Sequence, residues 1–137
     1  MGGFGSLYNG LTHPETFSKI AALSPALTIF GVPGFTPELI DHFFGSKEEF
    51  EASDANIGEA FLRNRPRPQL WFGCGQQDVL VWEQNKAFEE KLRAAGIDHE
   101  WMELPGNHDI HCWEQMMDRA FSFLAGIEPG TKEFLAL

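Results

Sequence analysis

Three short apolar segments punctuate the chain, and segments with helical periodicity stand before, between and after them. Each apolar segment is four to six residues of β-branched, aromatic and small side chains, and a polar or glycine-containing loop follows it. The predicted strands are Lys19–Ser24 (KIAALS), Gln69–Cys74 (QLWFGC) and His99–Leu104 (HEWMEL). This alternation predicts an α/β fold with about three parallel strands and flanking helices.

Segments 2–12, 80–95 and 110–125 are amphipathic and predict helices. Their boundaries have signals of their own, since His13 precedes a proline and Gly96 and Gly126 are glycines at helix ends. The side chains predicted to face the core are Phe4, Leu7, Tyr8 and Leu11 in the first helix, Val81, Trp82, Phe88, Leu92 and Ala95 in the second, and Trp113, Met116, Met117, Ala120, Phe121 and Leu124 in the third.

Segment 26–66 has a different character, with proline, glycine and phenylalanine mixed among short helical patches. It is too rich in phenylalanine to be a disordered linker, so we expect a lid-like insertion of small helices within a single domain, 1–137. Four of its aromatic residues either line a pocket for an acyl group or fill a small core of the insertion. They are Phe30, Phe35, Phe43 and Phe44.

Composition narrows the classes of partner and compartment. The 137 residues suit one domain, and a formal charge of -10 argues against nucleic acid or an anionic membrane surface as the main partner. There is no apolar run long enough to span a bilayer and no signal-peptide pattern at the start, although a signal upstream remains compatible with the sequence. Two cysteines make no disulfide framework, so a reducing compartment, the cytoplasm, is expected.

An acid and a histidine follow successive predicted strands. Asp78 follows the second strand and His108 the third, and ligands in parallel sheets bind at these strand ends. A glycine turn, Gly2-Gly3, precedes both, which is the chain order serine, acid, histidine of the α/β-hydrolase triad. Histidine can take the proton of a serine hydroxyl and return it, while the carboxylate orients the imidazole. The competing interpretations are that Asp78 caps a helix and that His108 is an ordinary loop residue.

Three stretches together resemble one family. MGGFGSLYNGLTHPETFSKIAALSPAL, WFGCGQQD and ELPGNHDIHCW resemble the putative-esterase family of α/β hydrolases, which includes esterase D and tributyrin esterase. The resemblance implies that Asp78 is the catalytic acid and His108 the catalytic base of a short-chain acyl esterase. It also implies an acyl-enzyme mechanism without a cofactor or metal and a small-molecule ester substrate. Trp113 is a further candidate for the pocket.

In that family the nucleophilic serine stands in a G-x-S-M-G-G turn, and Met1-Gly2-Gly3 match its last three residues. The serine would therefore fall just before Met1, and the backbone nitrogen of Met1 would be an oxyanion donor. The resemblance thus implies the C-terminal part of a serine esterase, which alone is expected to be inactive.

Two other functions stay open. The first is a non-catalytic binding or interaction module that keeps the pocket around Asp78 and His108. The second is a thiol or metal enzyme built on Cys74, Cys112 and the run His108-Asp109-Ile110-His111-Cys112. Weaker candidates are Ser6 as a substitute nucleophile and His111 as the base, while Ser24, His13, His42 and His99 are interpreted as structural.

A sheet of three strands leaves the outer edge of Lys19–Ser24 without a partner. An apolar parallel edge pairs readily with another chain, so we expect the isolated chain to self-associate or to be marginally stable. Sedimentation velocity across a concentration series measures this. A monomer at every concentration that also melts cooperatively would contradict the expectation.

Overall fold

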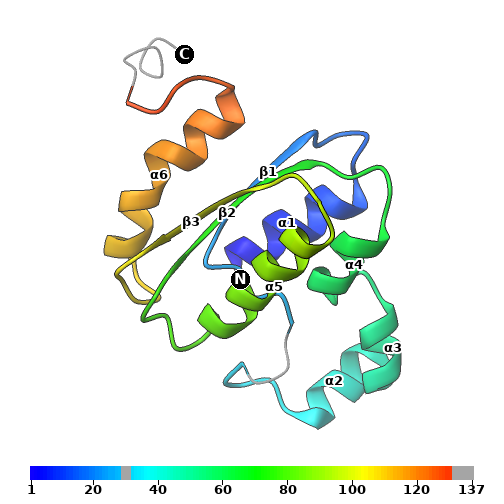
Figure 1. Cartoon of the computed structure of the whole chain (residues 1–137). Helices are drawn as coiled ribbons and strands as arrows, with labels where there is room; N and C mark the ends of the chain where they lie inside the picture. The colour runs from blue at the N-terminus through cyan, green and yellow to red at the C-terminus, as the bar shows by residue number, and fades with distance from the viewer. Residues whose placement is uncertain (29–31, 131–137) are drawn as a thin grey trace.

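The fold is seen in a computed structural model that describes residues 1–28 and 32–130 (Figure 1). Phe30 lies outside the described residues. The elements are, in order, α1 (Gly2–Thr12), β1 (Lys19–Leu23), α2 (Pro37–Phe44), α3 (Lys47–Ala52), α4 (Ile57–Arg63), β2 (Gln69–Gly75), α5 (Trp82–Ala94), β3 (Glu100–Leu104) and α6 (Ile110–Ala125). The predicted strands and the three long helices are confirmed, with boundaries shifted by two residues or fewer.

The three strands form one parallel sheet in the order β1-β2-β3. Residue Ile20 pairs with Leu70, and Phe72 pairs with Ala22 on one side and Trp101 on the other. Strand β2 is central, and every residue from Leu70 to Gly75 is buried, as expected for a parallel strand covered on both faces. The predicted parallel α/β sheet is therefore confirmed.

Helices cover both faces of the sheet. Helices α1, α4 and α5 pack on one face, where Leu7, Phe61 and Phe88 join Ile20 and Phe72 in the larger core. Helix α6 lies alone on the other face among the described elements (Figure 1). Its buried side chains pack on Trp71 of β2. Because the strands run the same way, the loops after β1, β2 and β3 meet at one end of the sheet.

Several side chains predicted to face the core are exposed, and these predictions were wrong. Tyr8 is 38% exposed and stacks on Phe4, while Phe121 and Leu124 are 44% and 43% exposed. A three-stranded sheet is narrow, so the fully buried side chains of α6 in this core are the stripe Cys112, Met116 and Ala120, with Trp113 and Phe123 partly buried beside it. Ala95 is also exposed, because α5 ends before it. The side chains of Trp82, Trp113 and Met117 are half-buried.

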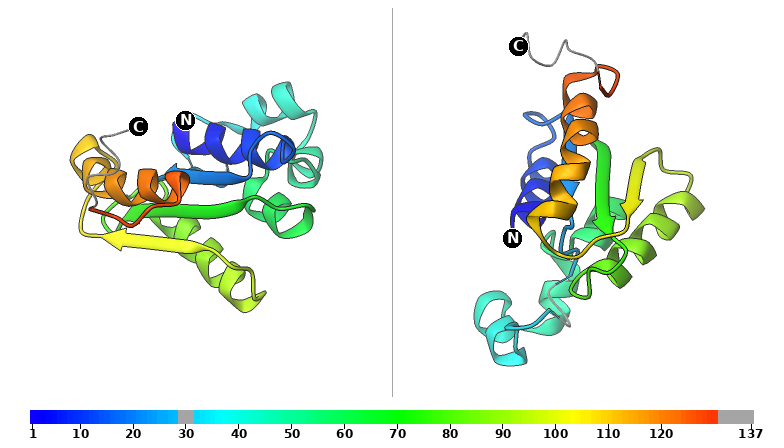
Figure 2. Two further views of the ribbon diagram at one scale, coloured as in Figure 1. Left: turned by 90° about the horizontal axis from the view of Figure 1, so that it is seen from above. Right: turned by 90° about the vertical axis from the view of Figure 1, so that its left-hand side faces the viewer.

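Three small helices occupy the part of segment 26–66 that the structure describes. Helix α2 begins at the N-cap Thr36 and α3 at the N-cap Ser46, whose side chains accept the N–H groups of Leu39 and Glu49. Helices α2 and α3 share a small core of Ile40, Phe50 and Ala55. The right-hand view of Figure 2 shows both helices beyond the ends toward which the strand arrows point. The insertion therefore lies on the side of the sheet where the strand-end loops meet.

The outer edge of β1 borders an open groove. Its floor is Lys19, Ile20 and Ala21, and its sides are α1 and the exposed Leu124 of α6, with a volume of about 410 Å³. Strand β1 pairs with β2 alone among the described strands, so its other edge keeps unpaired backbone groups. Self-association through this edge stays a prediction. None of the helices within residues 1–28 and 32–130 combines the length and apolarity needed to cross a membrane.

Two glycines in α1 provide a matched test of how this helix packs. A Cβ atom at Gly3 would lie 2.7 Å from the carbonyl oxygen of Leu23 and from Cα of Pro25, whereas a Cβ atom at Gly5 would meet nothing within 4 Å. We expect Gly5→Ala to raise the free energy of unfolding by about 0.5–1 kcal/mol, because alanine favours the helix. We expect Gly3→Ala to lower it by about 1–3 kcal/mol, because backbone must move.

Urea unfolding followed by circular dichroism measures both variants. Equal stability of Gly3→Ala and Gly5→Ala would show that α1 does not sit as closely on the end of β1 as described.

Candidate active site

Asp78 lies in the loop after β2 and is completely buried. Its Oδ1 atom accepts the backbone N–H groups of Leu80 and Val81 at 3.1 and 3.3 Å. The N-cap of α5 is Val81, so Asp78 is not the capping residue of that helix. Its second oxygen, Oδ2, faces His108. The turn therefore holds the carboxylate by one oxygen and leaves the other for an interaction with the imidazole.

His108 lies between the end of β3 and the start of α6. Its Nδ1 atom is 2.7 Å from Oδ2 of Asp78, and its side chain is 29% exposed. With the carboxylate accepting, Nδ1 carries the proton, and Nε2 is left with a lone pair. The next residue, Asp109, is the N-cap of α6 and accepts the N–H of Cys112 at 3.0 Å. The imidazole thus stands at a fixed helix start with its outer nitrogen available as a base.

Two glycines allow the close packing around the loops that carry Asp78 and His108. A Cβ atom at Gly75 would lie 2.3 Å from the carbonyl oxygen of Gly106, and one at Gly106 would lie 2.7 Å from Sγ of Cys112. Gln77 joins the loops in both directions. Its N–H donates to the Gly106 oxygen at 2.9 Å, and its Oε1 accepts the Gly106 N–H at 2.7 Å. Sequence reasoning missed Gln77, and its only signal was its place directly before Asp78.

Two adjoining hollows are lined by His108. The larger, about 620 Å³, is mostly apolar, and its lining includes Met1, Phe35, Phe43 and Phe44. The smaller, about 310 Å³, is lined in part by Met1, Ser24 and Trp113. The structure thus brings the predicted residues Met1, Phe35, Phe43, Phe44 and Trp113 around His108. Phe35 and Phe44 also pack on the small core of α2 and α3, as one interpretation of the aromatic residues predicts, while binding of an acyl group in the hollow stays a prediction.

The weaker candidates lie elsewhere or are already engaged. Ser6 Oγ donates to the Gly2 carbonyl, and Ser24 Oγ accepts the indole N–H of Trp113 at 3.1 Å. His111 has an 87% exposed side chain near Glu114, so it does not face Asp78. Among the described residues, no three side chains of metal-ligating type gather at one point. The other histidines are the exposed His13 and His42 and the part-buried His99.

Both cysteines are buried and unpaired. Burial, and after it the nearby charge of Asp78, raise the pKa of the Cys74 thiol from 9.0 to about 12. Burial also raises the pKa of Cys112. The thiolate, not the thiol, is the nucleophile, so neither side chain is activated at neutral pH. The cysteines do not have the environment that a thiol enzyme requires.

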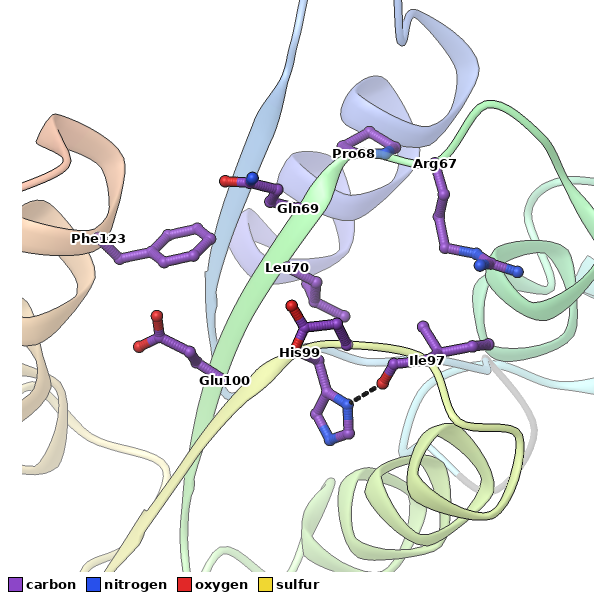
Figure 3. Close-up of a pocket in the computed structure, with 9 residues that line it drawn as sticks. Arg67, Pro68, Gln69, Leu70, Ile97, His99, Glu100 and Phe123 are labelled. Carbon is purple, nitrogen blue, oxygen red and sulfur yellow. Dashed lines mark hydrogen bonds between the residues drawn. The ribbon is translucent and has the colours of Figure 1, made fainter.

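A further cavity of about 430 Å³ lies at the opposite end of β2 and β3 (Figure 3). Its polar side chains do not converge, since Arg67 and Glu100 lie on opposite sides of the view. Arg67 donates to the carbonyl oxygens of Phe61 and Leu62, and His99 Nδ1 is 2.7 Å from the Ile97 oxygen. Both side chains are thus engaged with backbone oxygens.

The raised pKa of Cys74 predicts a pH dependence of stability. Well below pH 9 the thiol is protonated in both states and contributes nothing to the pH dependence. Between pH 9 and about 12 the unfolded chain releases this proton and the folded chain does not, so the free energy of unfolding falls as pH rises. We expect this fall to be at most about 1.4 kcal/mol per pH unit from this group. In Cys74→Ala it should be absent.

Urea unfolding of the chain and of Cys74→Ala from pH 8 to 11 measures the difference in slope. Parallel curves for the two proteins would contradict a buried, protonated thiol at this position.

The chain is similar in sequence to proteins of known family. The protein family described as Putative esterase matches residues 1–124. An acetyl esterase from Caldicellulosiruptor saccharolyticus is 29% identical over 140 residues, which cover 93% of this chain and 52% of that protein. The chain therefore spans about half the length of the curated relative it matches.

Solved structures show the same fold. The S-formylglutathione hydrolase FrmB of Staphylococcus aureus superposes with a TM-score of 0.69 and 22% identity, covering 89% of this chain and 50% of that one. FphF, a fluorophosphonate-binding serine hydrolase of Staphylococcus aureus, gives a TM-score of 0.69 and 24% identity with the same coverage. A ferulic acid esterase gives 0.69 and 20%, covering 90% of this chain and 48% of that one. The sheet, its helices and the matched family together show that the chain belongs to the putative-esterase family and has an α/β-hydrolase fold.

Proposed function

We propose that this chain supplies the carboxylate and the imidazole of a serine carboxylic-ester hydrolase. The observation that carries the proposal is the 2.7 Å contact between Oδ2 of the buried Asp78 and Nδ1 of His108. A buried acceptor on Nδ1 keeps the imidazole in the tautomer whose Nε2 is a base, and it stabilises the imidazolium that forms. The serine that this base activates lies outside the 137 residues in this proposal.

The reaction would be ester hydrolysis through an acyl-enzyme. Nε2 of His108 takes the proton of the serine hydroxyl as its oxygen bonds to the ester carbonyl carbon. The tetrahedral intermediate collapses, the carbon–oxygen bond to the alcohol breaks, and the imidazolium gives its proton to the departing alcohol. Water then repeats the sequence on the acyl-enzyme and releases the carboxylic acid. Asp78 keeps its charge throughout and no cofactor takes part.

Two neighbouring features support this function. Met1 lines both hollows beside His108, so in this proposal its backbone nitrogen is placed to bind the oxyanion of the intermediate. Phe35, Phe43 and Phe44 would contact the acyl group in the larger hollow. Short acyl groups on an alcohol or thiol are the proposed substrates, in keeping with the names acetyl esterase and S-formylglutathione hydrolase. The two unpaired thiols support a reducing compartment such as the cytoplasm.

Hydrolysis of p-nitrophenyl butyrate tests the chain alone. We expect the 137-residue chain and its His108→Ala variant to show the same rate as buffer, because neither contains an activated nucleophile. A rate that vanishes in His108→Ala would place a nucleophile within these residues and contradict the proposal.

A chimera tests the positive half of the proposal. The part of the Caldicellulosiruptor saccharolyticus acetyl esterase that precedes its matched region is joined to Met1, and the same ester is used. We expect hydrolysis that falls by about 10³–10⁴-fold in Asp78→Asn and in His108→Ala. His111→Ala is the matched control, because its side chain is 87% exposed and should not change the rate. A folded, inactive chimera would favour the non-catalytic binding module.

A further inference from the structure

Ser24, directly after β1, has an unusual backbone. Its φ of 43° makes it the one non-glycine residue with positive φ among residues 1–28 and 32–130. Its backbone N–H donates to the Gly73 oxygen at 2.7 Å, and only 4% of the residue is exposed. Left-handed backbone is unfavourable for serine and persists where the surroundings demand it, often at functional sites. The chain therefore holds this hydroxyl in one place at a conformational cost.

The hydroxyl of Ser24 anchors Trp113. The indole Nε1–H of Trp113 donates to Ser24 Oγ at 3.1 Å, across 89 residues of sequence. The same indole meets the imidazole of His108 edge to face, with ring centroids 5.1 Å apart and ring planes at 88°. All three side chains line the smaller hollow. One end of the indole is thus fixed to the end of β1 while its ring contacts the catalytic base.

The contacts continue from His108 to the acid and beyond it. The Cys74 Sγ atom lies 3.9 Å from Oδ2 of Asp78, the oxygen that contacts His108. A continuous series of contacts therefore runs through the side chains of Ser24, Trp113, His108, Asp78 and Cys74. His108 is touched on Nδ1 by the carboxylate and on its ring by the indole.

A single hydrogen bond at Nδ1 holds the imidazole at one atom, and whenever that bond breaks the ring can turn about its Cα–Cβ and Cβ–Cγ bonds. A perpendicular indole removes this freedom, provided that the indole is itself fixed. Trp113 is half-buried on the first turn of α6, and this position alone does not fix its indole. The hydrogen bond from the indole to Ser24 does fix it. The hydrogen bond from Trp113 thus accounts for a serine at this position in spite of its positive φ.

We propose that Ser24 and Trp113 are positioning residues for His108. They hold the plane of the imidazole so that Nδ1 stays on Asp78 and Nε2 stays available to the hollow. The inference rests on the proposed function of the Asp78–His108 pair. Neither residue contacts the reacting atoms; Ser24 acts through Trp113, and Trp113 acts through the base.

Nitrogen-15 NMR of the histidine side chains in the full 137-residue chain tests this inference at a pH where His108 is neutral. The spectra report which nitrogen of His108 carries the proton. The variants are Ser24→Gly, which removes the hydroxyl and relieves the positive φ, and Trp113→Phe, which keeps a ring and removes the indole N–H. Matched controls are Ser46→Gly and Trp101→Phe, because Ser46 caps α3 and the Trp101 indole donates to Glu103.

In the unmodified chain we expect His108 to be protonated at Nδ1. In Ser24→Gly and Trp113→Phe we expect a mixture of the two tautomers, and in Ser24→Gly the Trp113 indole N–H should exchange with solvent about fivefold faster or more. The controls should match the unmodified chain. Amide spectra establish that each variant is folded. Folding is most certain for Ser24→Gly, because glycine adopts a positive φ without strain.

The outcomes separate the two proposals. Mixed tautomers in the unmodified chain would overturn the Asp78–His108 pair and the positioning role with it. An Nδ1–H tautomer that persists in folded Ser24→Gly and Trp113→Phe would overturn the positioning role and leave the proposed function standing. A change in the controls of the same size as in the variants would reduce Ser24 and Trp113 to ordinary packing residues.

Discussion

The parallel pairing of β2 with β1 and β3 is the constraint on which the rest of the molecule depends. A buried parallel strand needs partners on both edges and helices on both faces, because its backbone and side chains have no access to water. Strand β2 meets this demand with six successive buried residues. Since the three strands point the same way, the pairing also places Ser24, Asp78 and His108 at one end of the sheet. Stability and site geometry thus come from the same contacts.

The approach of the loops after β2 and β3 turns this common end into a site. A Cβ atom at Gly75 would collide with the backbone of Gly106, which explains glycine at Gly75, while the missing side chain at Gly106 leaves room for Cys112 of α6. Gln77 then holds the gap by hydrogen bonds in both directions. The loops that carry Asp78 and His108 are therefore held together by contacts of Gly75, Gln77 and Gly106, and the two side chains do not have to hold the loops together themselves.

The meeting of Asp78 and His108 was predictable because each follows an apolar strand within about four residues, and strand ends in a parallel sheet converge whatever the details of the loops. The burial of each side chain of α6 was less predictable. The helical periodicity places the apolar residues Phe121 and Leu124 on the face predicted to be buried. How much of that face is covered depends on the width of the sheet, and the periodicity of one helix carries no information on that width.

The contacts of Ser24 and Trp113 were beyond sequence reasoning for another reason. They join residues 89 positions apart through one hydrogen bond, and the positive φ of Ser24 has no signature in its residue type. The role of Gln77 was hidden in the same way, since a glutamine before an acidic residue in a loop is ordinary. The hydrophobic pattern of the sequence predicts the strands and helices. The geometry of the site within them depends on contacts between residues that are distant in the sequence.

Helix α6 is tied to β1 at both ends, through Trp113 and Ser24 near its start and through Lys19 Nζ and the Phe123 oxygen, 2.8 Å apart, near its end. The histidine is reached along the chain from β3, the most exposed of the three strands. Edges of this kind open first in native-state fluctuations. Because α6 is braced from the far edge of the sheet, a brief opening of β3 does not by itself release the helix that begins beside the imidazole. In hydrogen exchange, the amides of β3 and those of α6 would accordingly belong to different cooperative units, with the base on the boundary between them.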